Sequence, residues 1–203
     1  MKNSVFAALV GCRLHALSIF CVYVISCTIG ILMVQNGNQF ALSQRDRLVS
    51  AAIQTDKAAV NYQAGNKLSA ALYDFAGNVF IAAIPQTALG LGIFPPFFTV
   101  AYQGWVGGIV SVDGSHQSRF TNFKATAYYF VVILLQTVAF SLSIGAGVKC
   151  GLDTYRHNAK VNWKFWQLRI PRGSLIAVGY VYMVSLPLFL VGSCFEFLSS
   201  WNM

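Results

Sequence analysis

The chain has 203 residues, of which 56% are hydrophobic and only 10% charged, with a formal net charge of +8. Ordinary soluble domains carry roughly 25% charged residues, and a soluble protein needs a polar exterior that this composition cannot supply. The composition therefore excludes an ordinary soluble domain and favours a single integral membrane domain over residues 1–203, with lipid as part of its solvent.

Apolar stretches, taken in chain order, predict an all-α transmembrane bundle of about five spans with interfacial amphipathic helices on both sides. A helix needs about 20 residues to cross roughly 30 Å of hydrocarbon. The expected spans lie at about 16–34, 72–93, 97–112, 125–148 and 174–198.

The first span also has features of an export signal, because Lys2 and Arg13 precede an apolar run that contains the lipoprotein-type box ending at Cys27. A lipoprotein would continue with a polar tether, whereas this run stays apolar to Val34. We therefore expect an uncleaved first helix.

The segment after the first span, from Gln35 to about Ala71, is rich in alanine and straight-chain residues, with Leu42, Ile53 and Val60 near helical spacing. This pattern predicts one or two amphipathic helices on the outer membrane surface or against the bundle. They would serve either as a cap over the spans or as a docking surface for an extracytoplasmic partner.

The second and third spans come from one apolar run that is interrupted by Pro95 and Pro96. Proline lacks the N–H of a helical hydrogen bond, and it pushes the preceding residue out of helical geometry. We therefore divide the run into two short helices. The alternative is a re-entrant pair that returns to the same side.

Orientation follows from the segment 149–172, in which basic residues far outnumber the single acid, Asp153. The positive-inside rule places this segment in the cytoplasm. Five spans then put the N-terminus in the cytoplasm too, whereas a re-entrant pair would separate the two. We expect a bacterial inner (cytoplasmic) membrane, and we attribute the net charge to topology and lipid attraction rather than to nucleic-acid binding.

Aromatic and basic side chains alternate within that segment. Rings suit the headgroup zone, and each cation near an anionic leaflet contributes roughly 1 kcal/mol. A coupling surface for a cytoplasmic protein is the alternative. The lipid-interface candidates are Trp163, Lys164, Trp166, Arg169 and Arg172.

Helices in lipid associate through close packing of small residues. The helix-packing candidates are Gly90, Gly92, Gly104, Gly108, Gly147 and Gly151, the last of these at the expected end of the fourth span. Gln103, Gln136 and Glu196 are the polar intramembrane candidates. A carboxylate within a span is a functional candidate by default, although the expected depth of Glu196 also suits a hydrated interfacial group. Asp74 is expected at a membrane depth similar to that of Glu196.

Motifs for chemistry are missing from the sequence. The cysteines form no C-x-x-C spacing, the histidines are scattered, and there is no nucleophile elbow or phosphate loop. We therefore expect a protein that is not an enzyme, without catalytic residues, metal or cofactor.

The order of a first span, a long outer segment, and then "FAGNVFIAAIPQTALGLGI" and "AYQGWVGGIV" resembles the stage II sporulation protein M family. The approximately matching residues are Phe75, Asn78, Gly90, Gly92, Gln103, Gly104 and Gly108. The tail "VGSCFEFLSSW" is similar to the closing pattern of that family and places Glu196 on its terminal glutamate. The family usually has Pro-His-Gly and a glutamate entering the fourth span, where this chain has no histidine and carries Gln136.

That resemblance implies a membrane anchor for a peptidoglycan-degrading assembly in sporulating bacteria, and elsewhere a small multispan protein considered alongside transport systems. The expected function is a non-catalytic scaffold that recruits or stabilises partner proteins in a membrane complex. Its partners would be membrane lipids and other membrane or envelope proteins. The alternatives are a permease-like subunit for a lipid or small solute, suggested by Pro85, Pro95, Pro96 and Pro187, and an accessory subunit of an energy-transducing complex.

Overall fold

The computed structural model describes residues 2–159 and 169–199, which are helical apart from short connections. The elements are α1 (Lys2–Gln35), α2 (Gln39–Thr55), α3 (Lys57–Gln63), α4 (Lys67–Ala76), the π-helix η1 (Gly77–Ala83), α5 (Ile84–Leu89), the 3₁₀ turn η2 (Gly90–Gly92), α6 (Pro95–Ile109), α7 (Phe123–Asn158) and α8 (Arg172–Leu198). Within the described ranges the only β pairing is an isolated bridge between Val112 and Ser118. The expected all-α class is confirmed.

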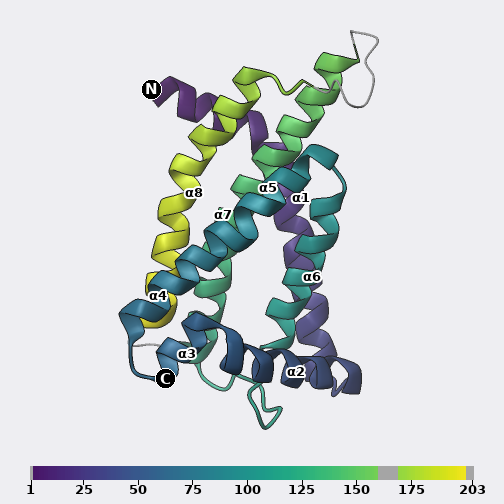
Figure 1. The fold of residues 1–203 in the computed structure, drawn as a ribbon. Coiled ribbons are helices and arrows are strands. Elements are labelled where there is room, and N and C mark those ends of the chain that lie inside the picture. Colours follow the sequence, from purple (N-terminus) through teal and green to yellow (C-terminus); the bar gives the residue numbers. More distant parts are fainter. Residues whose placement is uncertain (1, 160–168, 200–203) are drawn as a thin grey trace.

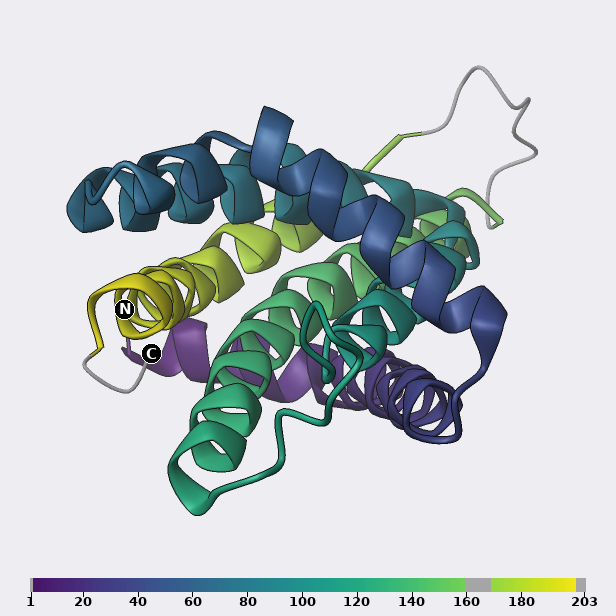
Figure 2. The same cartoon turned by 90° about the horizontal axis from the view of Figure 1, so that it is seen from below.

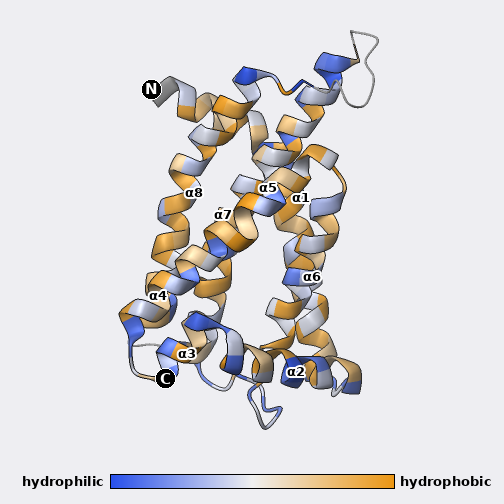
Figure 3. Cartoon of the chain, viewed as in Figure 1, coloured by the Kyte–Doolittle hydropathy of each residue, from blue (hydrophilic) through white to orange (hydrophobic). Residues whose placement is uncertain are grey.

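Four helical segments are long and apolar enough to cross a membrane. They are Ser4–Gln35, Lys67–Gly92, Phe123–Asn158 and Arg172–Leu198. Figure 3 shows hydrophobic residues along the middle of the molecule and hydrophilic ones gathered toward its two ends. The chain is therefore an integral membrane protein.

The long helices run between two ends of the molecule (Figure 1). α1, α6 and α8 lead away from the end at which α1 begins, and α7 returns to it. The continuous helix α4–η1–α5 crosses in front of α7, with its start beside α8 and its end against α7. We call the end at which α1 and α8 begin the basic end, and the opposite end the ledge end.

The core in the middle of the bundle is apolar. Phe140 and Phe189 meet edge to face with ring centroids 4.8 Å apart. The buried residues of this core are Ile19, Val79, Ala83, Val100, Ala139, Phe140, Ile144, Val148 and Phe189. Contributions come from α1, η1, α6, α7 and α8, so this cluster ties all the long elements together.

The two helices α2 and α3 form a ledge, defined here as residues 39–63. Figure 2 shows it running from the end of α1 to the start of α4. Both helices begin at side-chain caps, because Asn38 accepts a hydrogen bond from the N–H of Ala41 at 3.0 Å and Asp56 accepts one from Ala58 at 2.8 Å. These residues are strongly preferred at such positions. The sequence predicts one or two amphipathic helices in this segment, and the structure has α2 and α3 there. Their position at the membrane surface stays a prediction.

Apolar packing attaches the ledge to the bundle. Leu42 is buried in a second cluster with Val34, Ile109 and Val112. Phe40 stacks on Trp105 of α6, with ring centroids 5.9 Å apart.

A contact between Asp46 and His116 adds a polar attachment of the ledge to the loop after α6. Arg45 is buried and its Nη1 lies 3.0 Å from Asp46 Oδ1. Asp46 Oδ2 in turn lies 2.9 Å from Nε2 of His116, in the loop after α6.

The apolar run around the two prolines is divided into two helical segments, but the expected count of five spans is not confirmed, because α6 is not among the four helices that are long and apolar enough to cross a membrane. Helix η2 ends at Gly92, Ile93 has a φ of 67° in the left-handed region, and α6 begins at Pro95. Proline suits the first helical position because its missing N–H would have no partner there. The 15 residues of α6 span about 22 Å, less than a full crossing.

Substituting Gly108 by alanine should destabilise the bundle. A Cβ at this position would meet the carbonyl oxygen of Cys27, so α1 and α6 would have to separate. We expect a cost of about 1–3 kcal/mol, measured as a lowered unfolding midpoint in detergent. Gly179→Ala is the matched control, because no atom lies within 4 Å of a Cβ there. Equal midpoints for the two variants would contradict this packing.

The contribution of the Asp46 carboxylate to the stability of the ledge depends on pH in the acidic range. Hydrogen bonding to His116, followed by that to Arg45, lowers the pKa of Asp46 from its ordinary value of 3.8. The stabilisation is present above pH 3.8 and is lost as the pH falls through the lowered pKa. We expect an NMR titration to give a pKa below 3.8 for Asp46.

His116→Asn should bring that pKa back toward the ordinary value. Asparagine tolerates the left-handed backbone of position 116, where φ is 60°, so the turn would be kept while the imidazole contact is lost. An unchanged Asp46 pKa in this variant would show that the imidazole does not act on the carboxylate.

Candidate functional site

Polar side chains from three helices meet near the ledge end of the bundle. Asp74 on α4 accepts hydrogen bonds at Oδ2 from two donors, Asn78 Nδ2 at 2.9 Å and Ser193 Oγ at 2.6 Å. Asn78 stands four residues after Asp74 and therefore lies on the same helix face. Ser193 is buried on α8, so the Asp74 carboxylate links two neighbouring helices.

A second carboxylate, that of Glu196, lies on α8 about one helical turn after Ser193. Glu196 Oε2 accepts a hydrogen bond of 2.7 Å from Gln136 Nε2 on α7. The hydroxyl of Tyr128, also on α7, donates to the backbone carbonyl of Glu196 at 2.6 Å. Since Ser193 and Glu196 are three residues apart, they share one face of α8.

We call this group the outer polar cluster, defined by Asp74, Asn78, Tyr128, Gln136, Ser193 and Glu196. Polar groups removed from water are costly unless they are hydrogen-bonded. The cluster meets that need across helices rather than within one. It can accept protons or donors at two carboxylates, and it holds α4, α7 and α8 together at one level.

The helix changes its geometry where it leaves the cluster. Asn78 belongs to η1, in which the N–H of Ile84 bonds to the carbonyl of Val79 five residues earlier. Such π-helical segments are rare and are found frequently at functional sites. Beside this segment lies an open pocket of about 600 Å³ that Asp74 and Asn78 line together.

Two of the three polar candidates from the sequence are brought together. Gln136 and Glu196 bond directly, and Asp74 reaches the same group through Ser193. Gln103 lies on α6, outside this cluster.

The sequence alone does not reveal the partners of Asp74. The spacing of Asp74 and Asn78 is a usable signal, since an acid and an amide four residues apart in an apolar run share a face. Nothing in the sequence indicates that Ser193 faces them, because helix pairing in a bundle is not encoded in local spacing.

The candidate packing glycines on α6 face α1. A Cβ on Gly104 would meet the carbonyl oxygen of Tyr23, and one on Gly108 would meet that of Cys27. Both contacts are backbone to backbone, so a side chain would force the helices apart.

The remaining candidate glycines lie around the α5–α6 bend. Gly90 lies against the backbone of Gly147, and Gly151 lies against the carbonyl oxygen of Gly90. A Cβ on Gly92 would meet the ring of Pro95, 3.1 Å away in its own turn. Contrary to the sequence expectation, Gly151 is not at a helix end, because α7 continues to Asn158. The contact with η2 explains why glycine stands inside the helix.

Of the lipid-interface candidates, only two belong to the described residues. Arg169 and Arg172 are exposed at the start of α8. Asn158 fixes this region by accepting a hydrogen bond from the N–H of Arg169 at 3.2 Å. Trp163, Lys164 and Trp166 lie outside the described residues.

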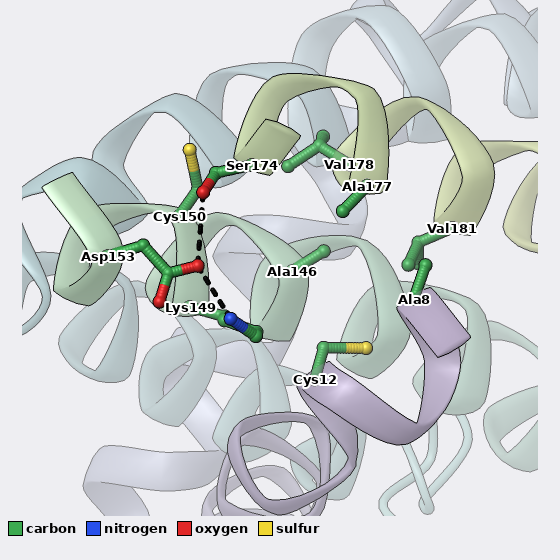
Figure 4. Close-up of a pocket in the computed structure, with 10 residues that line it drawn as sticks. All are labelled: Ala8, Cys12, Ala146, Lys149, Cys150, Asp153, Ser174, Ala177, Val178 and Val181. Carbon is green, nitrogen blue, oxygen red and sulfur yellow. Dashed lines mark hydrogen bonds and ion pairs between the residues drawn. The ribbon is translucent and has the colours of Figure 1, made fainter. Parts of the chain in front are cut away.

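A smaller polar group near the basic end has a different character (Figure 4). Lys149 Nζ lies 2.6 Å from Asp153 Oδ2, and Ser174 donates to the same oxygen at 3.0 Å. The cavity beside these residues measures about 10 Å³, which is about the space of one water molecule. This group joins α7 to α8 and has no room for a ligand.

Within the described ranges, no three His, Cys, Asp or Glu side chains are grouped so that they could hold a metal ion. Comparisons of the chain with protein-family models, curated proteins and solved structures found no match. The similarity to the stage II sporulation protein M family therefore stays a hypothesis.

The Gln136–Glu196 contact should be measurable as an energetic coupling. In a double-mutant cycle of Gln136→Ala and Glu196→Ala, we expect a coupling of about 1 kcal/mol, typical of hydrogen bonds between membrane helices. Unfolding in detergent gives the free energies. The control cycle combines Gln103→Ala with Glu196→Ala and should be additive. Additivity in both cycles would mean that the contact does not stabilise the bundle.

Proposed function

We propose that this chain is a non-catalytic membrane scaffold that recruits or stabilises partner proteins and holds them at its ledge. The observation that carries the proposal is the ledge itself. It is anchored to the bundle by apolar packing and by the Arg45–Asp46–His116 contacts, yet it leaves apolar side chains uncovered.

The exposed large apolar side chains of the ledge include Phe40, which lies near α1 and stacks on Trp105. The other two lie further from α1. Ile53 on α2 and Val60 on α3 are 43% and 44% exposed. Apolar side chains that together form an exposed patch mark protein–protein contacts. A surface held in place in advance loses little conformational freedom when a partner binds.

The apolar core supports a scaffold over a permease. The outer polar cluster and the Lys149–Asp153 pair lie on opposite sides of the cluster that contains Ile144, Phe140 and Phe189. A permeant would have to displace this close-packed layer, whose side chains come from five elements. A scaffold moves nothing across the membrane, so a permanently closed apolar core is compatible with that function.

For the topology we infer five crossings with the N-terminus in the cytoplasm of a bacterial cell and the ledge outside. The bend between η2 and α6 lies against Gly147 and Gly151, beside Lys149, and so reaches the level of the basic end. The exposed cations Arg169 and Arg172 also lie at that end. The positive-inside rule then assigns it to the cytoplasm.

Photo-crosslinking from the ledge tests the proposal. A photoreactive amino acid at position 53 should give adducts with a defined envelope or membrane protein in living cells. The same group at Ile176, which is 57% exposed on α8, should give mainly lipid adducts and serves as the control. The absence of protein adducts at position 53, or the same adducts at both positions, would argue against the scaffold.

A genetic measurement adds the functional consequence. The captured partner should fall in abundance or leave its complex when the chain is deleted, and wild-type protein should restore it. Ile53→Glu should restore it far less, because a charge would occupy an apolar contact. If Ile53→Glu restores the partner fully, the ledge is not the docking surface.

A further inference from the structure

The pocket of about 600 Å³ lies between the α2–α3 junction and the helix α4–η1, at the edge of the outer polar cluster. Its lining combines acidic, basic and apolar groups. The residues used below are Asp56, Lys57, Asp74, Asn78, Phe80 and Ile81.

The acidic groups of the pocket have acceptor capacity that the described part of the chain does not use. Both hydrogen bonds to Asp74 fall on Oδ2, and no described residue donates to its Oδ1. Among the described residues, Asp56 accepts one hydrogen bond, at Oδ1, from the N–H of Ala58. A cationic donor would find two carboxylates here.

One cation balances these acids in part. Lys57 lies directly after Asp56 and holds its Nζ 5.6 Å from the centroid of the Tyr73 ring. The lining therefore carries both signs of charge with an excess of acid. A ligand that matches it has a cation and an anion a short distance apart.

The remaining wall of the pocket is apolar and faces outward. Phe80 is 65% exposed and Ile81 is 80% exposed. Both belong to η1, in the middle of the segment Lys67–Gly92 that is long and apolar enough to cross a membrane. Their exposed apolar surface is therefore suited to contact with hydrocarbon.

We propose that this pocket binds a zwitterionic phospholipid with a primary ammonium head group, of the phosphatidylethanolamine class. The ammonium donates to Asp74 Oδ1 and to Asp56, the phosphodiester pairs with Lys57, and an acyl chain covers Phe80 and Ile81. An anionic lipid would meet the excess of carboxylates, and a water-soluble amine would leave the apolar wall uncovered. The proposal is independent of the scaffold function.

Lipid titration of the purified full-length chain, followed by native mass spectrometry, tests the site. The probes are phosphatidylethanolamine, phosphatidylcholine and phosphatidylglycerol with identical acyl chains. We expect phosphatidylethanolamine to bind about tenfold more tightly than phosphatidylglycerol, and more tightly than phosphatidylcholine, which cannot donate a hydrogen bond.

Single substitutions locate the binding. Asp56→Asn removes a charge but keeps a good helix cap, and it should weaken phosphatidylethanolamine binding about fivefold, as should Asp74→Asn and Lys57→Gln. Asp113→Asn is the matched control. It removes an acid from the loop after α6, outside the pocket, where asparagine also suits the turn that Asp113 makes with the N–H groups of Ser115 and Gln117.

Equal affinities for the three lipids would overturn the proposal. So would an Asp56→Asn variant that binds phosphatidylethanolamine as tightly as Asp113→Asn does. Asp74→Asn disturbs bonds to α8, so its helical content is checked by circular dichroism. If that variant does not fold, the Asp56→Asn result alone decides.

Discussion

Contact between helix backbones at glycine is the interaction on which the rest of this structure depends. Lipid is as apolar as the side chains, so helices gain little from leaving it and must gain from close packing instead. Gly104 and Gly108 bring α6 onto α1, while Gly90, Gly147 and Gly151 bring the end of α5 and the start of η2 onto α7. These two close contacts lie on either side of the Gly92–Pro95 bend, and together they hold the short helix α6 against the bundle.

The same contacts determine where the carboxylates lie. The continuous helix from α4 to η2 is held at one end by the glycines of α7, close to a hydrogen bond of 2.8 Å between Thr87 and Tyr182 of α8. Because a helix is rigid, fixing one of its ends also fixes the position of the other end. That place is beside α8, where Asp74 meets Ser193. Packing near the basic end thus positions the polar cluster near the ledge end.

The sequence predicts those features that depend on local chemistry. Pro95 and Pro96 mark the bend because proline cannot continue a helix, and spacing in the outer segment indicates the helices of the ledge. The sequence also singles out Gln136 and Glu196 as polar groups in apolar surroundings. It does not predict that they touch, nor that Ser193 turns toward Asp74, because these contacts depend on the rotation of one helix against another. The π-helical turn η1 has no local signal either, since its apolar residues also suit an ordinary α-helix.

The two polar groups of the bundle differ in how completely their charges are matched. Near the basic end, Lys149 and Ser174 both bind one oxygen of Asp153, beside a cavity of about 10 Å³. Near the ledge end, the hydrogen-bond partners of Asp74 among the described residues are the neutral Asn78 and Ser193, and Asp74 lines a pocket of about 600 Å³. A charge that is paired within the protein contributes to structure, whereas an acceptor that remains available beside an open pocket can be satisfied from outside. This asymmetry is the physical reason to look for binding on the ledge side of the membrane.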